Sequence, residues 1–462
     1  MVDTTARALR RALIPFALAQ FICSFAGSNM NVMINDISAD LGTTVAGVQL
    51  AITIFLLVMA ALMIPGGKLT DRIGRKRCLT VGLLVYAVGA LLSAAAPGLG
   101  VLILGNSLLE GVGTAMLIPP VYILTTLLFT DVTSRAKAFG AISAMGGIGA
   151  ATGPLIGGFL TTAFSWRVAF LFQTAVVLLI AVLSRRWVHD PLPADPTRPT
   201  DLGGAVLSAL GLVLVVSGIL AADDNVAVMI ALLVAGAGVL LWFFASMRAK
   251  ERTGRPALLS MTLFRNRTSN LGMVTQSAQW LMLMGTSFVV SAYLQVVRGY
   301  NAIETGVVFT ATTAGLLLSS LAAERFAKRR AQRTLIVAGF LITMAGVVLL
   351  LTLVYASKSV AMFVPGLFVI GFGLGGMLTP SVNVVQSSFG EDLQGEISGL
   401  SRSVSNLGSA LGGAVAGTIL VAELGSRPGT GYAAAMIAVA VAGLIGLAAA
   451  WFLPRTAAPA PA

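Results

Sequence analysis

The segment Gly66-Gly-Lys-Leu-Thr-Asp-Arg-Ile-Gly-Arg-Lys-Arg77 decides the fold, because it places five cationic side chains and one carboxylate between two long apolar stretches. Each flanking stretch is long enough to cross a bilayer as a helix. Clustered Lys and Arg are held on the cytoplasmic side of a membrane. The segment therefore predicts a tight cytoplasmic loop between two membrane spans.

The composition extends this interpretation to the whole chain. Its 462 residues are 57% hydrophobic and only 10% charged, which is too little charge to cover a soluble globule of this size. The net charge of +12 gathers in alternate connections between apolar stretches, where it sets membrane orientation. We therefore expect an integral membrane protein within a lipid bilayer and no nucleic-acid partner.

Apolar stretches of about 20 residues recur along the chain and predict fourteen spans, with both termini cytoplasmic. Met116-Leu-Ile-Pro119 recurs as Met377-Leu-Thr-Pro380, and a spaced set of glycines recurs at nearly the same separation. That set is Gly140, Gly149, Gly153 and Gly158, which recur as Gly399, Gly408, Gly412 and Gly417. We predict an amino-terminal six-helix bundle (1–190), cytoplasmic linkers with an inserted two-span hairpin (191–268), and a carboxy-terminal six-helix bundle with a short tail (269–462).

Two charged residues fall inside predicted spans. Glu110 lies at a depth of roughly 14 Å, where an ionised carboxylate costs about 2.5–3.5 kcal/mol. It is expected to face a polar cavity, pair with a cation or hold a proton, and the alternative is a neutral acid that serves helix packing. Arg402 needs a partner too, and the alternatives are Glu110, Glu396 or snorkelling to the surface. We predict that Glu110 and Arg402 take part in proton coupling.

Polar, aromatic and methionine side chains with spacing suited to a lined cavity occur in three predicted spans, the first, the ninth and the twelfth. Each could instead join helices or fill the core. The predicted substrate-cavity residues are Asn29, Asn31, Gln276, Gln279, Trp280, Met284, Asn383 and Gln386. The sequence contains no phosphate-binding loop and no metal-ligand cluster, so we expect no metal, no cofactor and no use of ATP.

The 66–77 segment resembles the signature loop of the major facilitator superfamily, and Gly149-Ala-Ala-Thr-Gly-Pro-Leu-Ile-Gly-Gly158 resembles that superfamily's antiporter motif. The whole chain is similar to its 14-span drug/proton antiporters. This resemblance implies an all-α membrane protein with two pseudo-symmetric six-helix bundles plus the hairpin. The chain also departs from the family pattern, since Ala26, Ser107 and Glu110 stand where an Asp, an Arg and a Gln are common.

The resemblance also implies roles for two groups of residues. Gly67, Asp71, Arg72, Gly74, Arg75 and Lys76 match a latch that holds the two halves together on the cytoplasmic side. Gly149, Gly153, Pro154, Gly157 and Gly158 match the helix associated with export. From physics alone, the second group is a face for close helix packing with a proline bend.

We therefore predict a transporter rather than an enzyme. It would export small amphipathic or cationic compounds in exchange for protons, as a monomer in the cytoplasmic membrane of a bacterium. A second interpretation is a dedicated exporter of one metabolite, antibiotic or lipid, which need not be proton-coupled. A membrane receptor or scaffold that transports nothing is the third.

Overall fold

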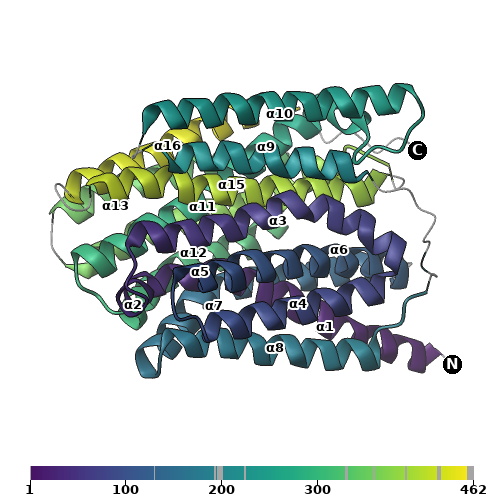
Figure 1. Cartoon of the computed structure of the whole chain (residues 1–462), viewed down its shortest axis with the longest axis horizontal. Coiled ribbons are helices and arrows are strands. Elements are labelled where there is room, and N and C mark those ends of the chain that lie inside the picture. Colours follow the sequence, from purple (N-terminus) through teal and green to yellow (C-terminus); the bar gives the residue numbers. More distant parts are fainter. Residues whose placement is uncertain are drawn as a thin grey trace.

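The computed structural model describes residues 2–129, 131–191, 194, 201–222, 225–327, 331–356, 359–390, 393–423 and 428–454. Within these ranges every regular element is a helix (Figure 1). In the amino-terminal part these are α1 (Val2–Asn29), η1 (Met30–Met33), α2 (Ile34–Asp40), α3 (Val45–Ile73), α4 (Arg75–Ala94), α5 (Leu99–Leu102), η2 (Ile103–Glu110), α6 (Gly111–Leu128), α7 (Val132–Ala163) and α8 (Trp166–Trp187).

The remaining elements begin with a helical hairpin, α9 (Leu202–Leu220) and α10 (Val226–Arg252). They continue with η3 (Met261–Phe264), α11 (Arg267–Ala292), η4 (Tyr293–Val297), α12 (Ala302–Ala327), α13 (Gln332–Ala356), η5 (Val360–Met362), α14 (Phe363–Gln386), α15 (Gln394–Glu423) and α16 (Pro428–Trp451).

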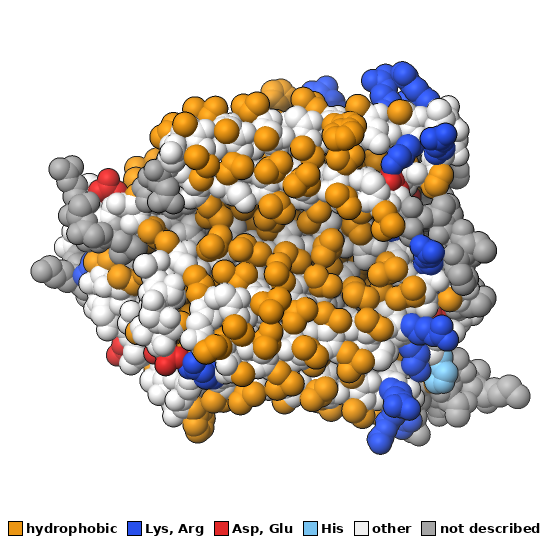
Figure 2. Space-filling model, in the orientation of Figure 1, with side chains coloured by type: hydrophobic (Ala, Val, Ile, Leu, Met, Phe, Trp, Pro, Cys, Tyr) orange, Lys and Arg blue, Asp and Glu red, His pale blue; other side chains and the backbone are white. Residues whose placement is uncertain are grey.

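The long helices run roughly parallel along the longest axis of the molecule (Figure 1). By length and composition, 13 are able to cross a membrane, and a fourteenth is added if the bent pair Lys137–Ala150 and Thr152–Ala163 is one span. Hydrophobic side chains cover the middle of the face in Figure 2, and most of its Lys and Arg side chains lie at the end where Figure 1 places the N-terminus. The all-α membrane fold predicted from the sequence is confirmed.

The structure corrects the prediction of a loop at 66–77. Helix α3 continues to Ile73 and α4 begins at Arg75, so only Gly74 separates them, with a φ of +94° that favours glycine. Gly66 is needed for packing instead, because a Cβ there would lie 2.2 Å from the carbonyl oxygen of Ala115. The basic side chains therefore project from two helix ends that meet at one sharp corner.

The two halves of the chain pack their helices in the same way. Helix α7 packs on α1 and α15 packs on α11, while α4 and α13 pack on α6 and α14. The repeated glycines occupy equivalent contacts. A Cβ at Gly149 would meet the backbone of Phe21 at 2.2 Å, and one at Gly408 would meet the backbone of Ser277 at 2.3 Å. The internal repeat thus corresponds to repeated packing, and the exact boundaries at 190 and 268 stay a prediction.

Two seams join these halves. Helix α3 packs along α15, and α7 packs along α12. At the second seam a Cβ on Gly158 would lie 2.4 Å from the carbonyl oxygen of Ala302, and one on Gly306 would lie 2.4 Å from that of Pro154. Such close backbone approach holds the halves by van der Waals contact where lipid supplies no hydrophobic driving force.

The hairpin formed by α9 and α10 lies at one side of the molecule (Figure 1). Helix α9 packs on both α3 and α15, so it covers the first seam, whereas α10 packs mainly on α9. Only 11% of the span window of α10 is buried, and Leu241 and Trp242 expose 71% and 65% of their surface. A helix this apolar and this exposed fits a lipid-facing position.

Candidate substrate cavity

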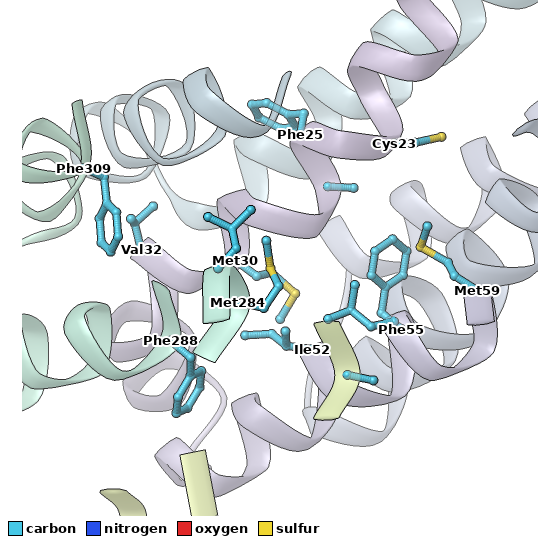
Figure 3. Packing of buried hydrophobic residues seen from close by; sticks show 14 of the residues in the cluster. Cys23, Phe25, Met30, Val32, Ile52, Phe55, Met59, Met284, Phe288 and Phe309 are labelled. Carbon is cyan, nitrogen blue, oxygen red and sulfur yellow. The ribbon is translucent and has the colours of Figure 1, made fainter. Parts of the chain in front are cut away.

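A cavity of about 70 Å³ lies where α1, α3, α6, α11 and α15 meet. Its apolar wall contains Leu56, Met59, Met63, Ile118 and Met284, and Trp280 adds an aromatic ring. Its polar wall contains Gln20, Ser24, Arg402, Ser405, Asn406 and Ser409. Figure 3 shows Cys23, Met59 and Met284 in the surrounding hydrophobic cluster, drawn from three different helices. The cavity thus lies between the two halves of the molecule.

The polar wall comes mainly from one face of α15. Arg402, Ser405, Asn406 and Ser409 follow the i, i+3, i+4, i+7 spacing that aligns side chains on a helix. The guanidinium of Arg402 lies over the ring of Tyr122 at 4.8 Å from its centroid and donates a hydrogen bond to the Tyr122 hydroxyl. That hydroxyl donates to Oε1 of Gln20 at 3.2 Å. Arg402 is therefore positioned by side chains from the opposite half.

A second cavity of about 40 Å³ lies farther along α1 and α11. It shares Ala150 and Met284 with the first and is lined by Asn31, Ser287, Ser291 and Thr312, among others. Neither cavity approaches the roughly 300 Å³ or more that a drug-sized ligand needs. The two halves must therefore move apart before a substrate of that size can enter.

The end of the molecule away from the N-terminus is closed by hydrogen bonds between the halves. Nε2 of Gln295 donates to the carbonyl oxygen of Asn31 at 2.9 Å, and Oε1 of Gln295 accepts from the backbone N–H of Asn35 at 3.1 Å. In the α3–α15 seam, Nε2 of Gln49 donates to the carbonyl oxygen of Gly413 at 3.0 Å. These side-chain-to-backbone bonds and the close backbone contacts at Gly158 and Gly306 hold the halves together at this end.

The opposite end is joined by an ion pair that the sequence interpretation missed. Nζ of Lys68, near the end of α3, lies 2.7 Å from Oε1 of Glu396 at the start of α15. Oε2 of Glu396 also accepts from the backbone N–H of Ser260 at 3.0 Å. Glu396 is thus bound to Lys68 and is not the partner of Arg402.

The predicted latch residues lie together at the Gly74 corner, close to Gly67. Nη2 of Arg75 lies 2.9 Å from Oδ1 of Asp71, and the backbone N–H groups of Arg75 and Lys76 donate to Oδ2 of Asp190. These bonds connect α3, α4 and the segment after α8 within one half. Arg72 is exposed at the same corner, and a latching role between the halves stays a prediction for all of these residues.

Glu110 does not line either cavity. It is 0% exposed at the end of η2, a π-helical segment, and Oε1 accepts from the Ser93 hydroxyl at 3.4 Å. Oε2 has no hydrogen bond within the described ranges, and Tyr86 beside it donates to Gln173 at 2.6 Å. The pairing with Arg402 considered from the sequence is not found, because Glu110 lies in the seam between α4 and η2.

The predicted antiporter helix is a packing face in this structure. Added Cβ atoms at Gly149, Gly153 and Gly157 would meet α1 at 2.2, 2.0 and 3.0 Å, while Gly158 meets α12. The helix bends by 40° between Ala150 and Thr152. This agrees with Pro154, which cannot donate to the carbonyl of Ala150.

The structure divides the predicted cavity residues. Asn31, Trp280 and Met284 line a cavity, as does Arg402. Asn29, Gln276 and Gln279 are buried between helices, where Gln276 accepts from Ser401 at 2.8 Å and Gln279 donates to Leu374 at 3.2 Å. Asn383 is exposed and Gln386 is half-buried near the end of α14, and neither lines a cavity.

The sequence interpretation missed Gln20, Ser24, Ser405, Asn406 and Ser409. Their signal was present in the spacing, because the last three continue the helical face that begins at Arg402. Within the described ranges no group of three His, Cys, Asp or Glu side chains could hold a metal ion.

An all-helical membrane protein with two similarly packed halves and a cavity between them has the architecture of secondary transporters. The sequence profile of the Major Facilitator Superfamily matches residues 16–413 and, in a second match, 273–462. The chain belongs to this superfamily, as the resemblance indicated.

Three relatives illustrate its position there. Puromycin resistance protein pur8 of Streptomyces alboniger is 32% identical, over 88% of this chain and 81% of that protein. Multidrug efflux pump LfrA of Mycolicibacterium smegmatis is 30% identical, over 80% and 73%. The probable actinorhodin transporter of Streptomyces coelicolor is 28% identical, over 87% and 70%. The superfamily match and the relatives named as an efflux pump and a probable transporter confirm that the chain is a transporter and not an enzyme.

A solved structure shows the same fold at low sequence identity. The peptide transporter POT, crystallised in complex with sulfate, superposes with a TM-score of 0.71 and 17% identity over 96% of this chain and 95% of that one. The agreement in fold covers nearly the whole chain.

Proposed function

We propose that this protein exports small amphipathic compounds across the cytoplasmic membrane of a bacterium, in exchange for protons. The cavity between the halves carries the proposal, since it combines an apolar wall with a polar one and is closed at both ends by contacts between the halves. Rocking of the halves would break one set of contacts while the other holds. Relatives named as efflux pumps and resistance proteins support the outward direction.

The orientation follows from charge. Most Lys and Arg side chains visible in Figure 2 lie at the N-terminal end, which the positive-inside rule assigns to the cytoplasm. The Lys68–Glu396 pair is then the cytoplasmic closure, and the Gln295 bonds form the outer closure. The predicted latch at Asp71, Arg72 and Arg75 would brace the α3 end that carries Lys68. The tail after residue 454 lies outside the described residues.

For the proton we propose Glu110. An ionised carboxylate in this dry seam would cost about 2.5–3.5 kcal/mol with no cation beside it in the described residues, so the acid form suits the closed seam. Loss of the proton would require water to enter between α4 and η2. Arg402 we assign to the substrate cavity, because its contacts are with Tyr122 and the cavity rather than with Glu110.

Proteoliposomes test this proposal. The purified protein should move ethidium or dansylglycine above the leak of protein-free liposomes, and an imposed pH gradient should drive accumulation. Glu110→Gln should reduce gradient-driven accumulation by about tenfold or more while downhill exchange continues. Glu251→Gln, an exposed site on α10, is the matched control.

Two results would count against it. Gradient-driven accumulation by a well-folded Glu110→Gln variant would remove Glu110 from the coupling step. An absence of flux for both dyes, with and without the gradient, would remove the transport function itself.

A further inference from the structure

The cavity carries one formal charge among its lining residues, and that charge is positive. Arg402 supplies it, and no Asp, Glu or Lys lines either cavity. The two acids considered from the sequence as partners of Arg402 contact other residues, since Glu396 pairs with Lys68 and Glu110 is buried at the end of η2, where it accepts from Ser93. The walls around Arg402 therefore offer it ring faces and hydroxyls but no counter-charge.

The contacts of Arg402 within the protein use only part of its hydrogen-bonding capacity. A guanidinium has five N–H donors, and the described structure gives this one a single hydrogen bond, to Tyr122. Stacking on the Tyr122 ring fixes the guanidinium plane without occupying its other donors. The unused donors belong to a side chain that lines the cavity.

Asn406 adds a second donor group one turn along α15. Its amide makes no hydrogen bond within the described residues, and it lines the same cavity. By contrast, the hydroxyls of Ser405 and Ser409 donate back to the carbonyl oxygens of Ser401 and Ser405. A forked guanidinium and an amide N–H₂ on one helix face match the two oxygens of a carboxylate or related oxyanion.

We propose that the substrates of this transporter are amphipathic organic anions, whose oxyanion group binds Arg402 and Asn406 while their apolar body contacts Trp280 and the methionine wall. This inference rests on the proposed export function and names its substrate class. It selects against the cationic compounds left open by the sequence, because a cation would meet a guanidinium with no neighbouring carboxylate. An anion neutralises that guanidinium inside the membrane, where an uncompensated charge is costly.

Binding to the detergent-purified full-length protein tests the charge preference directly. Dansylglycine and N-dansylethylenediamine share one fluorophore and differ in the charge of the side arm. Dansylglycine should bind the native protein at least about tenfold more tightly than the amine. Arg402→Gln should weaken dansylglycine binding by about tenfold or more, and Arg402→Lys should weaken it less because the charge remains.

Asn406→Asp provides an independent test of the charge preference, because it places a carboxylate beside Arg402. It should lower dansylglycine binding and raise binding of the amine, so the preference reverses. Lys137→Gln, which removes one exposed charge outside the cavity, should change neither. Size-exclusion profiles equal to the native protein's establish that the variants are folded.

Tighter native binding of the amine, or dansylglycine binding that Arg402→Gln and Asn406→Asp both leave unchanged, would overturn the anion inference. If liposomes then still transport ethidium, the export function survives that failure. Arg402-dependent dansylglycine binding without any flux would uphold the anion site and refute export instead.

Discussion

Asp201 fixes both the beginning and the end of the inserted hairpin. It is the N-cap of α9, where its carboxylate accepts from the backbone N–H of Gly204 at 2.7 Å, and it pairs with Nζ of Lys250 of α10 at 2.6 Å. It also accepts from the backbone N–H of Leu258 at 3.1 Å. Burial raises the pKa of Asp201, but the bonds from Lys250, Gly204 and Leu258 together outweigh burial and hold the pKa below its usual range.

Removing that charge should destabilise the protein in a pH-dependent way. Asp201→Asn keeps a capping side chain but loses the pair with Lys250, so we expect a loss of about 1 kcal/mol at pH 7, seen as a lower Tm in detergent. Because the folded pKa is depressed, the contribution is present above the unfolded pKa of about 4 and is lost as the pH falls through the folded pKa.

The Tm difference between native protein and Asp201→Asn should therefore shrink as the pH falls below about 4. Glu251→Gln should show no such difference at any pH. A Tm difference that stays constant down to the lowest pH measured would show that the hairpin is not held by this charge.

At the scale of elements, α7 packs against two helices, α1 and α12, through one set of glycines. Gly149, Gly153 and Gly157 contact α1 within the same half, whereas Gly158 contacts the α12 backbone of the other half. The bend upstream of Pro154 lets one helix reach both partners. The small residues are therefore structural in each contact, and Gly158 alone among these four lies at a seam between the halves.

Gly158→Ala should hinder closure of the α7–α12 seam. A Cβ there would lie 2.4 Å from the carbonyl oxygen of Ala302, too close for any real contact, so the halves must separate locally. We expect transport to fall about tenfold, with Thr162→Cys in the same background labelled faster by an impermeant maleimide from outside. Gly147→Ala is the matched control, because nothing lies within 4 Å of its Cβ position.

An equal effect of the two alanines would assign the loss to helix propensity or general packing rather than to the seam.

These elements show what the sequence could and could not predict. The repeated glycine spacing predicted the repeated packing, because close backbone approach excludes every larger side chain. The same reasoning failed at Gly66, where a packing glycine was interpreted as part of a turn. The direction of the Glu110 side chain could not be predicted from helical periodicity, since the π-helical segment η2, which ends at Glu110, shifts the phase of the helix.

Arg402 illustrates the same limit for contacts. Its need of a partner was predicted from its depth, but Tyr122 lies in the other half of the chain and no local pattern joins the two. The α15 face was different, because Arg402, Ser405, Asn406 and Ser409 share one helical stripe that can be found from spacing alone.

At the scale of the whole molecule, the structure is closed at both ends around small cavities. The closure that we propose to be cytoplasmic includes the Lys68–Glu396 pair, whose side chains are 33% and 25% exposed. A half-exposed pair of this kind contributes modestly, roughly 0.2–1 kcal/mol. Such a weak bond suits a contact that would be broken and remade in each cycle of the proposed transport.

Breaking that pair should open the cytoplasmic end more often. In a Cys78→Ser background, Glu396→Gln should raise the rate at which Cys23, a cavity residue 4% exposed, reacts with a maleimide in inverted vesicles. An increase of about two- to fivefold corresponds to the strength of the pair. The double exchange Lys68→Glu with Glu396→Lys should return the rate most of the way to the native value.

If Glu396→Gln leaves the labelling rate unchanged, or the double exchange does not lower the raised rate, the Lys68–Glu396 pair does not contribute to closure.

The position of the hairpin makes the two seams different, because among the described residues only one seam is covered by an additional helix. Helix α9 covers the α3–α15 seam, while the α7–α12 seam is joined by glycine contacts without that extra layer. Lipid hydrocarbon chains can therefore contact the α7–α12 seam directly, whereas at the α3–α15 seam they contact α9 first. We therefore expect a solute dissolved in the lipid to meet fewer protein layers on its way to the centre beside α7 and α12 than beside α9.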